Sequence, residues 1–215
     1  MKIDVADTEI MEKLRKLASD GILFVSSIFS FYDLFLKNMI SFGRDSSKIK
    51  VIEVSAKTAI THIMSLYPLN DTQKHIINMD LKDDFMIAVN MMLLKHVIHN
   101  VIRNALFFVA GMENPRINIR LESHTYRSYN YIEISDNGVG MNSKTVDNIF
   151  QKFYTKRING AGLGLYFCKN AMYSMMGDIS AESVEGKGSA FTLMFPHSDV
   201  VENVIKWDGD ISSLC

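Results

Sequence analysis

Two asparagines stand one helical turn apart near the middle of the chain, at Asn100 and Asn104. Downstream lie Asp136 and two glycine clusters, residues 136–140 (DNGVG) and 160–164 (GAGLG). A side-chain amide can bind a hard metal ion, a carboxylate can accept a hydrogen bond from a base, and a glycine-rich helix start can approach an anion closely. Together these residue types predict a site for a nucleoside triphosphate and its metal.

Asp136 follows an alternating apolar run, residues 129–135, and therefore falls at the end of a predicted strand. Its carboxylate can accept a hydrogen bond from an exocyclic amine such as that of adenine. Gly138 and Gly140 leave room for a flat base to lie against backbone. An Asx turn that only ends the strand is the alternative interpretation. The second glycine cluster further along the chain favours the binding site.

The second glycine cluster opens a predicted helix. A helix start combines free amide groups with the positive end of the helix dipole, so it suits an anion such as phosphate. The residues predicted to bind phosphate are Gly160, Gly162, Leu163 and Gly164. Close packing alone is the alternative explanation of these glycines. The usual phosphate loop is excluded because the chain lacks G-x4-G-K-[S/T], and no strand directly precedes the cluster as a dinucleotide-binding turn requires.

Asn104 is predicted to lie on the same helical face as Asn100, among apolar residues. An amide on an apolar helix face is costly unless it is paired or bound to a metal. Its carbonyl could therefore serve Mg²⁺, which takes water and phosphate oxygens as its other ligands. Hydrogen bonding between the helix and a loop is the alternative, and it fits Asn100 better than Asn104.

Five short motifs follow one another in a recognisable order. They are Asn100-x3-Asn104, Asp136-x-Gly138-x-Gly140, Ile149-Phe150-x2-Phe153, Gly160-x-Gly162-x-Gly164 and Gly186-x-Gly188. This order resembles the N, G1, F, G2 and G3 boxes of the catalytic ATP-binding domain of sensor histidine kinases, in the gyrase/Hsp90/kinase/MutL superfamily. The resemblance covers about residues 50–196. It implies an α+β fold, a two-layer α/β sandwich (the Bergerat ATP-binding fold), with ATP and Mg²⁺ under a mobile lid at residues 141–161.

The resemblance also implies roles for particular residues. Asn104 and Asn100 would be the catalytic residues, with Asn104 as the metal ligand, and Asp136 would bind adenine. Three basic residues in the lid could contact phosphates, although a solvated loop face is the alternative; they are Lys152, Lys156 and Arg157. Phe150 and Phe153 would anchor the lid in a hydrophobic slot.

Position 100 favours phosphotransfer to histidine over hydrolysis. Superfamily members that split ATP with water carry a glutamate base there, whereas the amide of Asn100 cannot take a proton. A neutral imidazole already carries a nucleophilic lone pair. The resemblance therefore implies a protein-histidine kinase of a two-component phosphorelay, a transferase in signal transduction. A nucleotide-sensing interaction module without transfer is the alternative, and an ATP-hydrolysing machine is disfavoured.

The chain has no recognisable acceptor histidine. Its six histidines are His62, His75, His96, His99, His124 and His197, and none precedes the ATP-binding region. His96 and His99 are predicted to be structural. The run Leu66-Tyr67-Pro68 with residues 104–108 further resembles kinases that sense quorum-sensing autoinducers. Phe107 stands where many relatives place a basic residue near the phosphates.

The predicted domain organisation has four parts. Residues 1–42 are expected to be the second helix of a dimerisation and phosphotransfer hairpin, because apolar residues recur in steps of three and four; a membrane span at residues 21–40 is the alternative. Residues 43–50 are a linker, residues 51–198 the catalytic ATP-binding domain and residues 199–215 a tail. The expected partners are a second copy of the kinase and a response regulator or receiver domain.

Composition narrows the class of protein further. A net charge of -1 argues against nucleic acid or an anionic membrane as a partner. Two scattered cysteines fit a reducing compartment, so a cytoplasmic location is expected, as the cytosolic part of a membrane-bound sensor. Strands are predicted at residues 49–54, 75–81, 85–89, 116–122, 129–135, 178–183 and 189–195, and helices at 55–66, 91–109 and 163–176.

Overall fold

The computed structural model describes residues 51–124, 128–157, 160–201 and 205–206. The strands are β1 (Ile52–Ser55), β2 (Ile77–Asp80), β3 (Met86–Val89), β4 (Ile117–Glu122), β5 (Tyr129–Asp136), β6 (Asp178–Val184), β7 (Gly188–Pro196) and β8 (Ile205–Lys206). The helices are α2 (Ala56–Ser65), α3 (Asp71–Ile76), α4 (Met91–Val109), α5 (Ser143–Val146), α6 (Gly164–Ser174) and the 3-10 turn η2 (Ser198–Val200). All these elements belong to the unit formed by Ile49–Tyr154 and Gly162–Cys215, whereas Thr155–Ala161 belongs to another unit.

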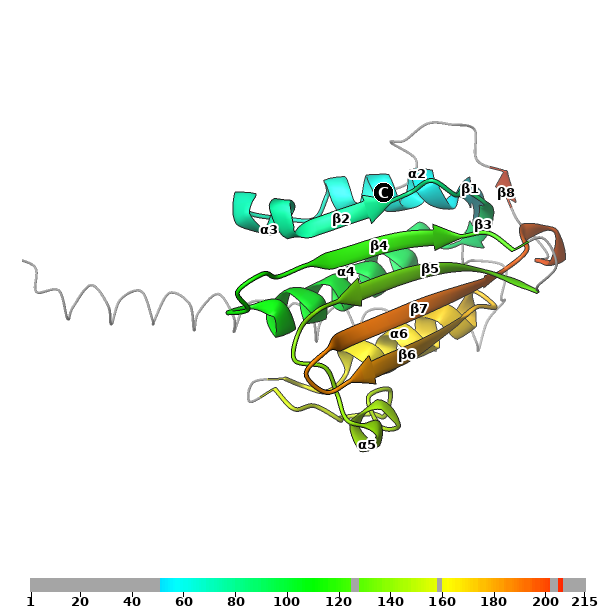
Figure 1. Ribbon diagram of the computed structural model, residues 1–215. Helices are drawn as coiled ribbons and strands as arrows, with labels where there is room; N and C mark the ends of the chain where they lie inside the picture. Colours follow the sequence, from blue (N-terminus) through cyan, green and yellow to red (C-terminus); the bar gives the residue numbers. More distant parts are fainter. Residues whose placement is uncertain (1–50, 125–127, 158–159, 202–204, 207–215) are drawn as a thin grey trace, which may run out of the picture. The chain divides into compact units, whose positions relative to one another are not determined.

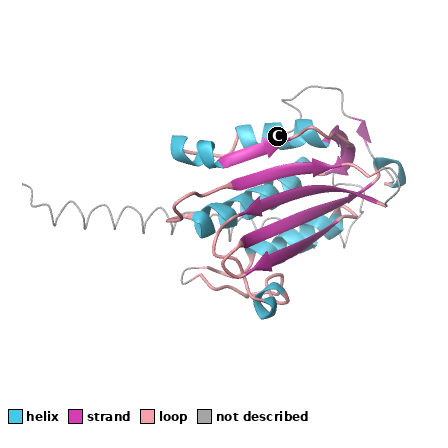
Figure 2. Cartoon of the chain, viewed as in Figure 1, coloured by secondary structure: helices cyan, strands magenta, loops and turns pink. Residues whose placement is uncertain are grey.

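A five-stranded sheet with the order β2-β4-β5-β7-β6 forms one layer of the domain. β2 and β4 are parallel, and the other neighbouring strands are antiparallel. Side chains alternate between a buried and a more exposed face, as in β4, where Ile117, Ile119 and Leu121 are buried while Asn118 and Arg120 are exposed. Helices α4 and α6 lie along one face of this sheet and form the second layer (Figures 1 and 2).

A smaller sheet has the order β3-β1-β8. β1 pairs antiparallel with β3 and parallel with β8, which comes from the segment that the sequence assigned to the tail. The predicted helix cap at Ser55 is confirmed, since its side chain accepts a hydrogen bond from the amide of Thr58 at 3.2 Å.

Helix α4 is the central helix of the domain, and its bounds are those predicted from the sequence. Asn90 caps its start by accepting a hydrogen bond from the amide of Leu93 at 3.0 Å. Its buried stripe recurs at helical spacing and packs toward the sheet and α6; it consists of Met91, Leu93, Leu94, Val97, Ile98, Val101, Ile102, Ala105 and Val109. The two asparagines of α4 lie beside this stripe.

Two predicted strands that are neighbours in the sequence do not pair with each other. The strands expected at residues 75–81 and 85–89 exist as β2 and β3, but β2 pairs with β4 and β3 pairs with β1, so the two lie in different sheets. The sequence prediction also missed α3. Asn70 and Gln73 form a capping box at its start, with each side chain accepting a hydrogen bond from the other residue's amide. This local signal was present in the sequence.

The predicted α+β sandwich is confirmed for the part of the chain that the structure describes. The long helix expected at residues 1–42 and the linker at 43–50 lie outside the described residues. Among the helices that are described, none has both the length and the apolar character needed to cross a membrane.

Candidate nucleotide-binding site

Helix α4 brings together two of the sequence motifs that lie far apart in the chain. Near its end, the carbonyl oxygen of Phe108 lies so close to Gly138 that a Cβ there would be 2.6 Å away. About two turns earlier, Asn100 faces the start of α6, where a Cβ on Gly164 would lie 3.0 Å from the Asn100 Oδ1. Asn104 lies between these contacts on the same helix. The loop after β5 and the start of α6 are therefore both positioned by α4.

Asp136 ends β5 and is half-buried. Its Oδ1 accepts a hydrogen bond from the amide of Gly138 at 2.8 Å. Burial raises the pKa of the Asp136 carboxyl, although the backbone amides of Gly138 and Ser189 act in the opposite direction. Burial of a carboxylate that has few partners is unfavourable for the protein alone, which is typical of functional positions.

The loop after Asp136 is fixed by the neighbouring residue. Asn137 accepts a hydrogen bond from the amide of Arg116 at 2.7 Å and donates one to the carbonyl of Asn114 at 2.8 Å. Further along the loop, Gly140 lies against the carbonyl of Val184 in the turn between β6 and β7. The chain therefore leaves β5 in a defined direction, with Asp136 held at the strand end.

The amide of Asn100 is held at both ends. Its Nδ2 donates to the carbonyl of His96 at 2.9 Å, and its Oδ1 accepts from the Arg103 Nη2 at 2.6 Å. The sequence favoured hydrogen bonding between the helix and a loop for Asn100, whereas both of these partners lie on α4 itself. Asn104, one turn later, is half-buried.

The start of α6 has no side-chain cap. Leu163 is the N-cap residue, and its side chain makes no capping hydrogen bond to the first turn. Helix starts leave amide groups without helical partners, so this end can bind an anion. Gly162 precedes it with a φ of 64° and lies so close to Phe153 that a Cβ would be 2.3 Å from the Phe153 carbonyl carbon. A glycine is required here for both reasons.

The remaining predicted phosphate-binding residues lie in the segment between α5 and α6. Lys152 is exposed, and its Nζ lies 5.1 Å from the centre of the Phe153 ring. Lys156, Arg157 and Gly160 belong to the separate unit Thr155–Ala161, in which the amide of Gly160 donates to the carbonyl of Arg157 at 3.1 Å. A role for these three residues at the phosphates stays a prediction.

The prediction that two phenylalanines anchor the lid is wrong for one of them. The Phe153 ring is 65% exposed, and its backbone has a positive φ of 66°. The backbone of Phe153 is in close contact with Gly162. Its side chain is exposed and does not pack in the core. Phe150 is half-buried, with the Lys169 Nζ 5.4 Å from its ring centre, and Ile149 is buried.

His96 and His99 pack against aromatic rings, which fits the structural role predicted for them. His99 meets Tyr67 edge-on with ring centres 4.7 Å apart, and His96 meets Phe167 at 6.2 Å. Burial lowers the pKa of both imidazoles and thereby favours their neutral form.

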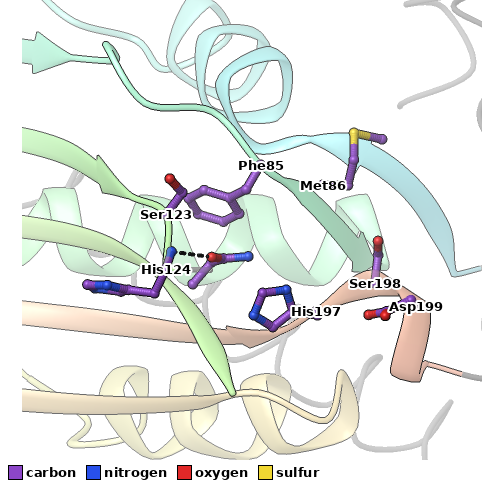
Figure 3. A pocket seen from close by; sticks show the side chains of 8 residues that line it. Phe85, Met86, Ser123, His124, His197, Ser198 and Asp199 are labelled. Carbon is purple, nitrogen blue, oxygen red and sulfur yellow. Dashed lines mark hydrogen bonds between the residues drawn. The ribbon is translucent and has the colours of Figure 1, made fainter. Parts of the chain in front are cut away.

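Two open cavities in the described part of the chain are lined by other residues. One, of about 440 Å³, lies at the loop of residues 113–116. The other, of about 430 Å³, lies near the start of β5 (Figure 3). It is lined by Phe85, Met86, Ser123, His124, Asn130, His197, Ser198 and Asp199. Asp136, Asn104 and Gly164 do not line either of these two cavities.

Sequence reasoning missed one charged residue at the site. Arg103 precedes Asn104 and is half-buried on α4, where it donates to Asn100. A signal was available, because residues three apart on a helix are neighbours.

Comparisons with known proteins agree with the fold. The fold is that of the histidine kinase catalytic domain: the nucleotide-free catalytic domain of ThkA superposes with a TM-score of 0.57 at 23% identity, covering 68% of this chain and 95% of that catalytic domain. Full-length ShkA in complex with AMPPNP gives a TM-score of 0.62 at 19% identity, covering 91% of this chain and 40% of ShkA. At these identities the likeness concerns the fold alone.

The family is shown by the sequence comparison. The model of the histidine kinase-, DNA gyrase B- and HSP90-like ATPases matches residues 90–199, and the chain belongs to this family. Sensor histidine kinase WalK of Bacillus subtilis is 30% identical over 131 residues, which are 58% of this chain and 21% of WalK. The CAI-1 autoinducer sensor kinase/phosphatase CqsS of Vibrio cholerae is 29% identical over 155 residues, 71% of this chain and 21% of CqsS. The chain thus spans about a fifth of these relatives, and the predicted family resemblance is confirmed.

Proposed function

We propose that this chain is the ATP-binding catalytic portion of a sensor histidine kinase, which transfers the γ-phosphoryl group of ATP to a histidine on a phosphotransfer hairpin. The observation that carries this proposal is the position of α4, which contacts the Asp136 loop at Phe108 and the start of α6 at Asn100. A site for a purine and a site for phosphates then lie along one helix.

The residues fit a bound nucleotide. Asp136 is partly desolvated, and one of its oxygens already accepts from Gly138, which orients the carboxylate. A donor such as the adenine amine would compensate for this burial. The first turn of α6, without a side-chain cap, offers amide donors to phosphate. We assign adenine binding to Asp136, with Gly138 and Gly140 beside it, and phosphate binding to Gly162, Leu163 and Gly164.

We assign the metal to Asn104. Mg²⁺ is bound in such sites by one or two protein oxygens together with phosphate oxygens and water. When bound, ATP and Mg²⁺ supply the transferable phosphoryl group and the positive charge that stabilises it. The protein contributes positioning, through Asn104 on α4 and the amides of α6. Lys152, Lys156 and Arg157 would add positive charge if their segments close over the phosphates.

Asn100 favours transfer over hydrolysis. The nitrogen and the oxygen of its side chain form hydrogen bonds to His96 and Arg103. In addition, an amide cannot accept a proton from water as a carboxylate does. A histidine acceptor does not need this help. The proposed reaction needs a histidine acceptor on a phosphotransfer hairpin. Its further partners would be a response regulator or receiver domain and a second copy of the kinase.

A quorum-sensing system is the finer part of the proposal. CqsS is named as an autoinducer sensor kinase/phosphatase and matches 71% of this chain, whereas WalK matches 58%. The support is the larger share of this chain that the CqsS match covers.

Two measurements test the proposed function. The full chain is mixed with radiolabelled ATP, Mg²⁺ and a separately produced helical hairpin that carries an acceptor histidine from a related kinase. Acid-labile phosphate on the hairpin supports the kinase, and a hairpin with His→Gln is the control. Clear nucleotide binding without any transfer would instead support a nucleotide-sensing module, and no binding by the chain would refute both.

A further inference from the structure

Arg103 lies between the two asparagines on α4 and forms a short hydrogen bond to one of them. Its Nη2 donates to the Asn100 Oδ1 at 2.6 Å. Hydrogen bonds from a charged donor are shorter and stronger than neutral ones. Because Arg103 is half-buried, this bond is less screened by water than it would be on an exposed surface.

The bond to Arg103 fixes which way the Asn100 amide points. The Nδ2 of Asn100 donates to the carbonyl of His96, one turn earlier on the helix, so the oxygen must point the other way. That oxygen is the closest atom to the position where a side chain on Gly164 would begin, at 3.0 Å. The Arg103 Nη2 lies 3.9 Å from the same position. The first residue of α6 therefore rests on the Asn100–Arg103 pair.

The Arg103 side chain lies within the contact between α4 and α6. Its positive charge acts on His99, on α4, and on Cys168, which is fully buried on α6. The guanidinium thus lies between the two helices, near Gly164 in the first turn of α6. A positive charge at this place adds to the positive end of the helix dipole.

We infer that Arg103 is a positioning residue for nucleotide binding, which holds the Asn100 carbonyl against Gly164 and so sets the start of α6 relative to Asn104. The inference rests on the proposed function, in which the metal bound by Asn104 also contacts the phosphates at α6. The distance between Asn104 and the start of α6 must therefore be kept fixed. Displacement of such groups by about 1 Å is enough to reduce catalysis strongly. A role confined to packing between α4 and α6 is the competing explanation.

The same geometry predicts how an acid at position 100 would behave. In Asn100→Asp one carboxylate oxygen keeps its place, with Arg103 as its ion-pair partner. The other oxygen replaces the Nδ2 that donates to the carbonyl of His96, so two acceptors would face each other there. Because Arg103 compensates for only one of these two contacts, we expect the Asn100→Asp variant to bind nucleotide more weakly than the original chain.

The test is a double-mutant cycle between positions 100 and 103 in the full chain. The variants are Arg103→Met, Arg103→Lys, Asn100→Ala and the double variant Asn100→Ala/Arg103→Met. The dissociation constant of Mg·ADP is measured by calorimetry, and the melting temperature is measured without nucleotide. We expect Arg103→Met to weaken Mg·ADP binding about tenfold, the effect of losing one charged hydrogen bond. Arg103→Lys should recover part of this loss, because it keeps the charge but not the planar fork.

The double variant separates positioning from packing. If Arg103 acts through Asn100, Asn100→Ala/Arg103→Met should bind Mg·ADP no more weakly than the worse single variant. Losses that multiply, or an Arg103→Met variant that melts earlier but binds Mg·ADP as the original chain does, would overturn the inference. If Arg103→Met does not fold, Arg103→Lys, Asn100→Ala and Asn100→Ala/Arg103→Lys form the same cycle. Failure of the original chain to bind Mg·ADP would instead overturn the proposed function, on which the inference depends.

Discussion

The two ends of helix α6 are built in opposite ways. At its end, the amides of Met176 and Gly177 donate to the carbonyls of Tyr173 and Met172, so the backbone itself satisfies the last turn. At its start, no side chain caps the amides that follow Leu163. A helix end whose carbonyl groups are hydrogen-bonded by the backbone has only a structural role. A helix start whose amide groups have no side-chain cap can bind a ligand.

The two ends of strand β5 differ in a related way. Near its start, Asn130 is 4% exposed, accepts a hydrogen bond from the amide of His124 at 2.8 Å and borders an open cavity (Figure 3). At its end, Asp136 is a half-buried carboxyl whose pKa burial raises, and neither of the two cavities includes it. The two ends therefore offer different features: open volume at the start of β5, and a carboxyl whose burial is unfavourable at its end.

The largest effect should follow from changing the acid at the end of β5. We expect Asp136→Asn to remove most of the stabilisation by Mg·ATP, which is about 2.7 kcal/mol at a hundredfold excess of ligand over its dissociation constant. Asp199→Asn makes the same chemical change in the open cavity and should leave this stabilisation unchanged. Thermal unfolding with and without Mg·ATP measures the stabilisation of each variant. Equal stabilisation of the two variants would show that Asp136 has no special role in nucleotide binding.

The next effect concerns the backbone before α6. Gly162→Ala should destabilise the domain by about 2 kcal/mol or more, because its φ of 64° is unfavourable for alanine and its Cβ would overlap Phe153. Gly186→Ala is the matched control, since Gly186 has a φ of 80° but no atom within 4 Å of the added Cβ. It should cost about 1 kcal/mol. Urea unfolding gives both values, and equal losses would argue against the close approach of Gly162 and Phe153.

A third prediction uses the pH dependence of stability. Because the folded-state pKa of Asp136 is raised above its ordinary value of 3.8, its contribution to stability is complete below that value. The contribution is lost as the pH rises through the folded-state pKa. Without nucleotide, Asp136→Asn should therefore be more stable than the original chain at neutral pH, and the difference should disappear in acid. Urea unfolding from pH 3 to pH 8 tests this, and a variant that is less stable at neutral pH would contradict it.

The smallest effect is expected at the end of α6. Met176 has a φ of 59° at the position where helices usually place glycine, and its side chain is 57% exposed. Met176→Gly should stabilise the domain by about 1 kcal/mol without changing the affinity for Mg·ATP. Thermal unfolding and calorimetry check the two parts. A change in nucleotide affinity would show that the two ends of α6 are coupled.

Local signals explain which elements could be predicted. The bounds of α4 follow from its apolar periodicity, and the cap at Ser55 follows from a residue type. The capping box at Asn70 was an equally local signal that the prediction overlooked. The partners of β2 and β3 could not be predicted, because each pairs with a strand chosen by packing of distant segments.

The amino-acid sequence by itself determined the family, the α+β fold and the residue types of the candidate nucleotide site, because amides, one acid and glycines at these spacings meet chemical requirements that act locally. Only the tertiary structure decided that Phe108 supports the Asp136 loop while Asn100 and Arg103 support Gly164. The physical reason is that the contact between α4 and α6 forms from segments far apart in the chain, and the direction of a side-chain amide is set by the neighbours that folding brings to it.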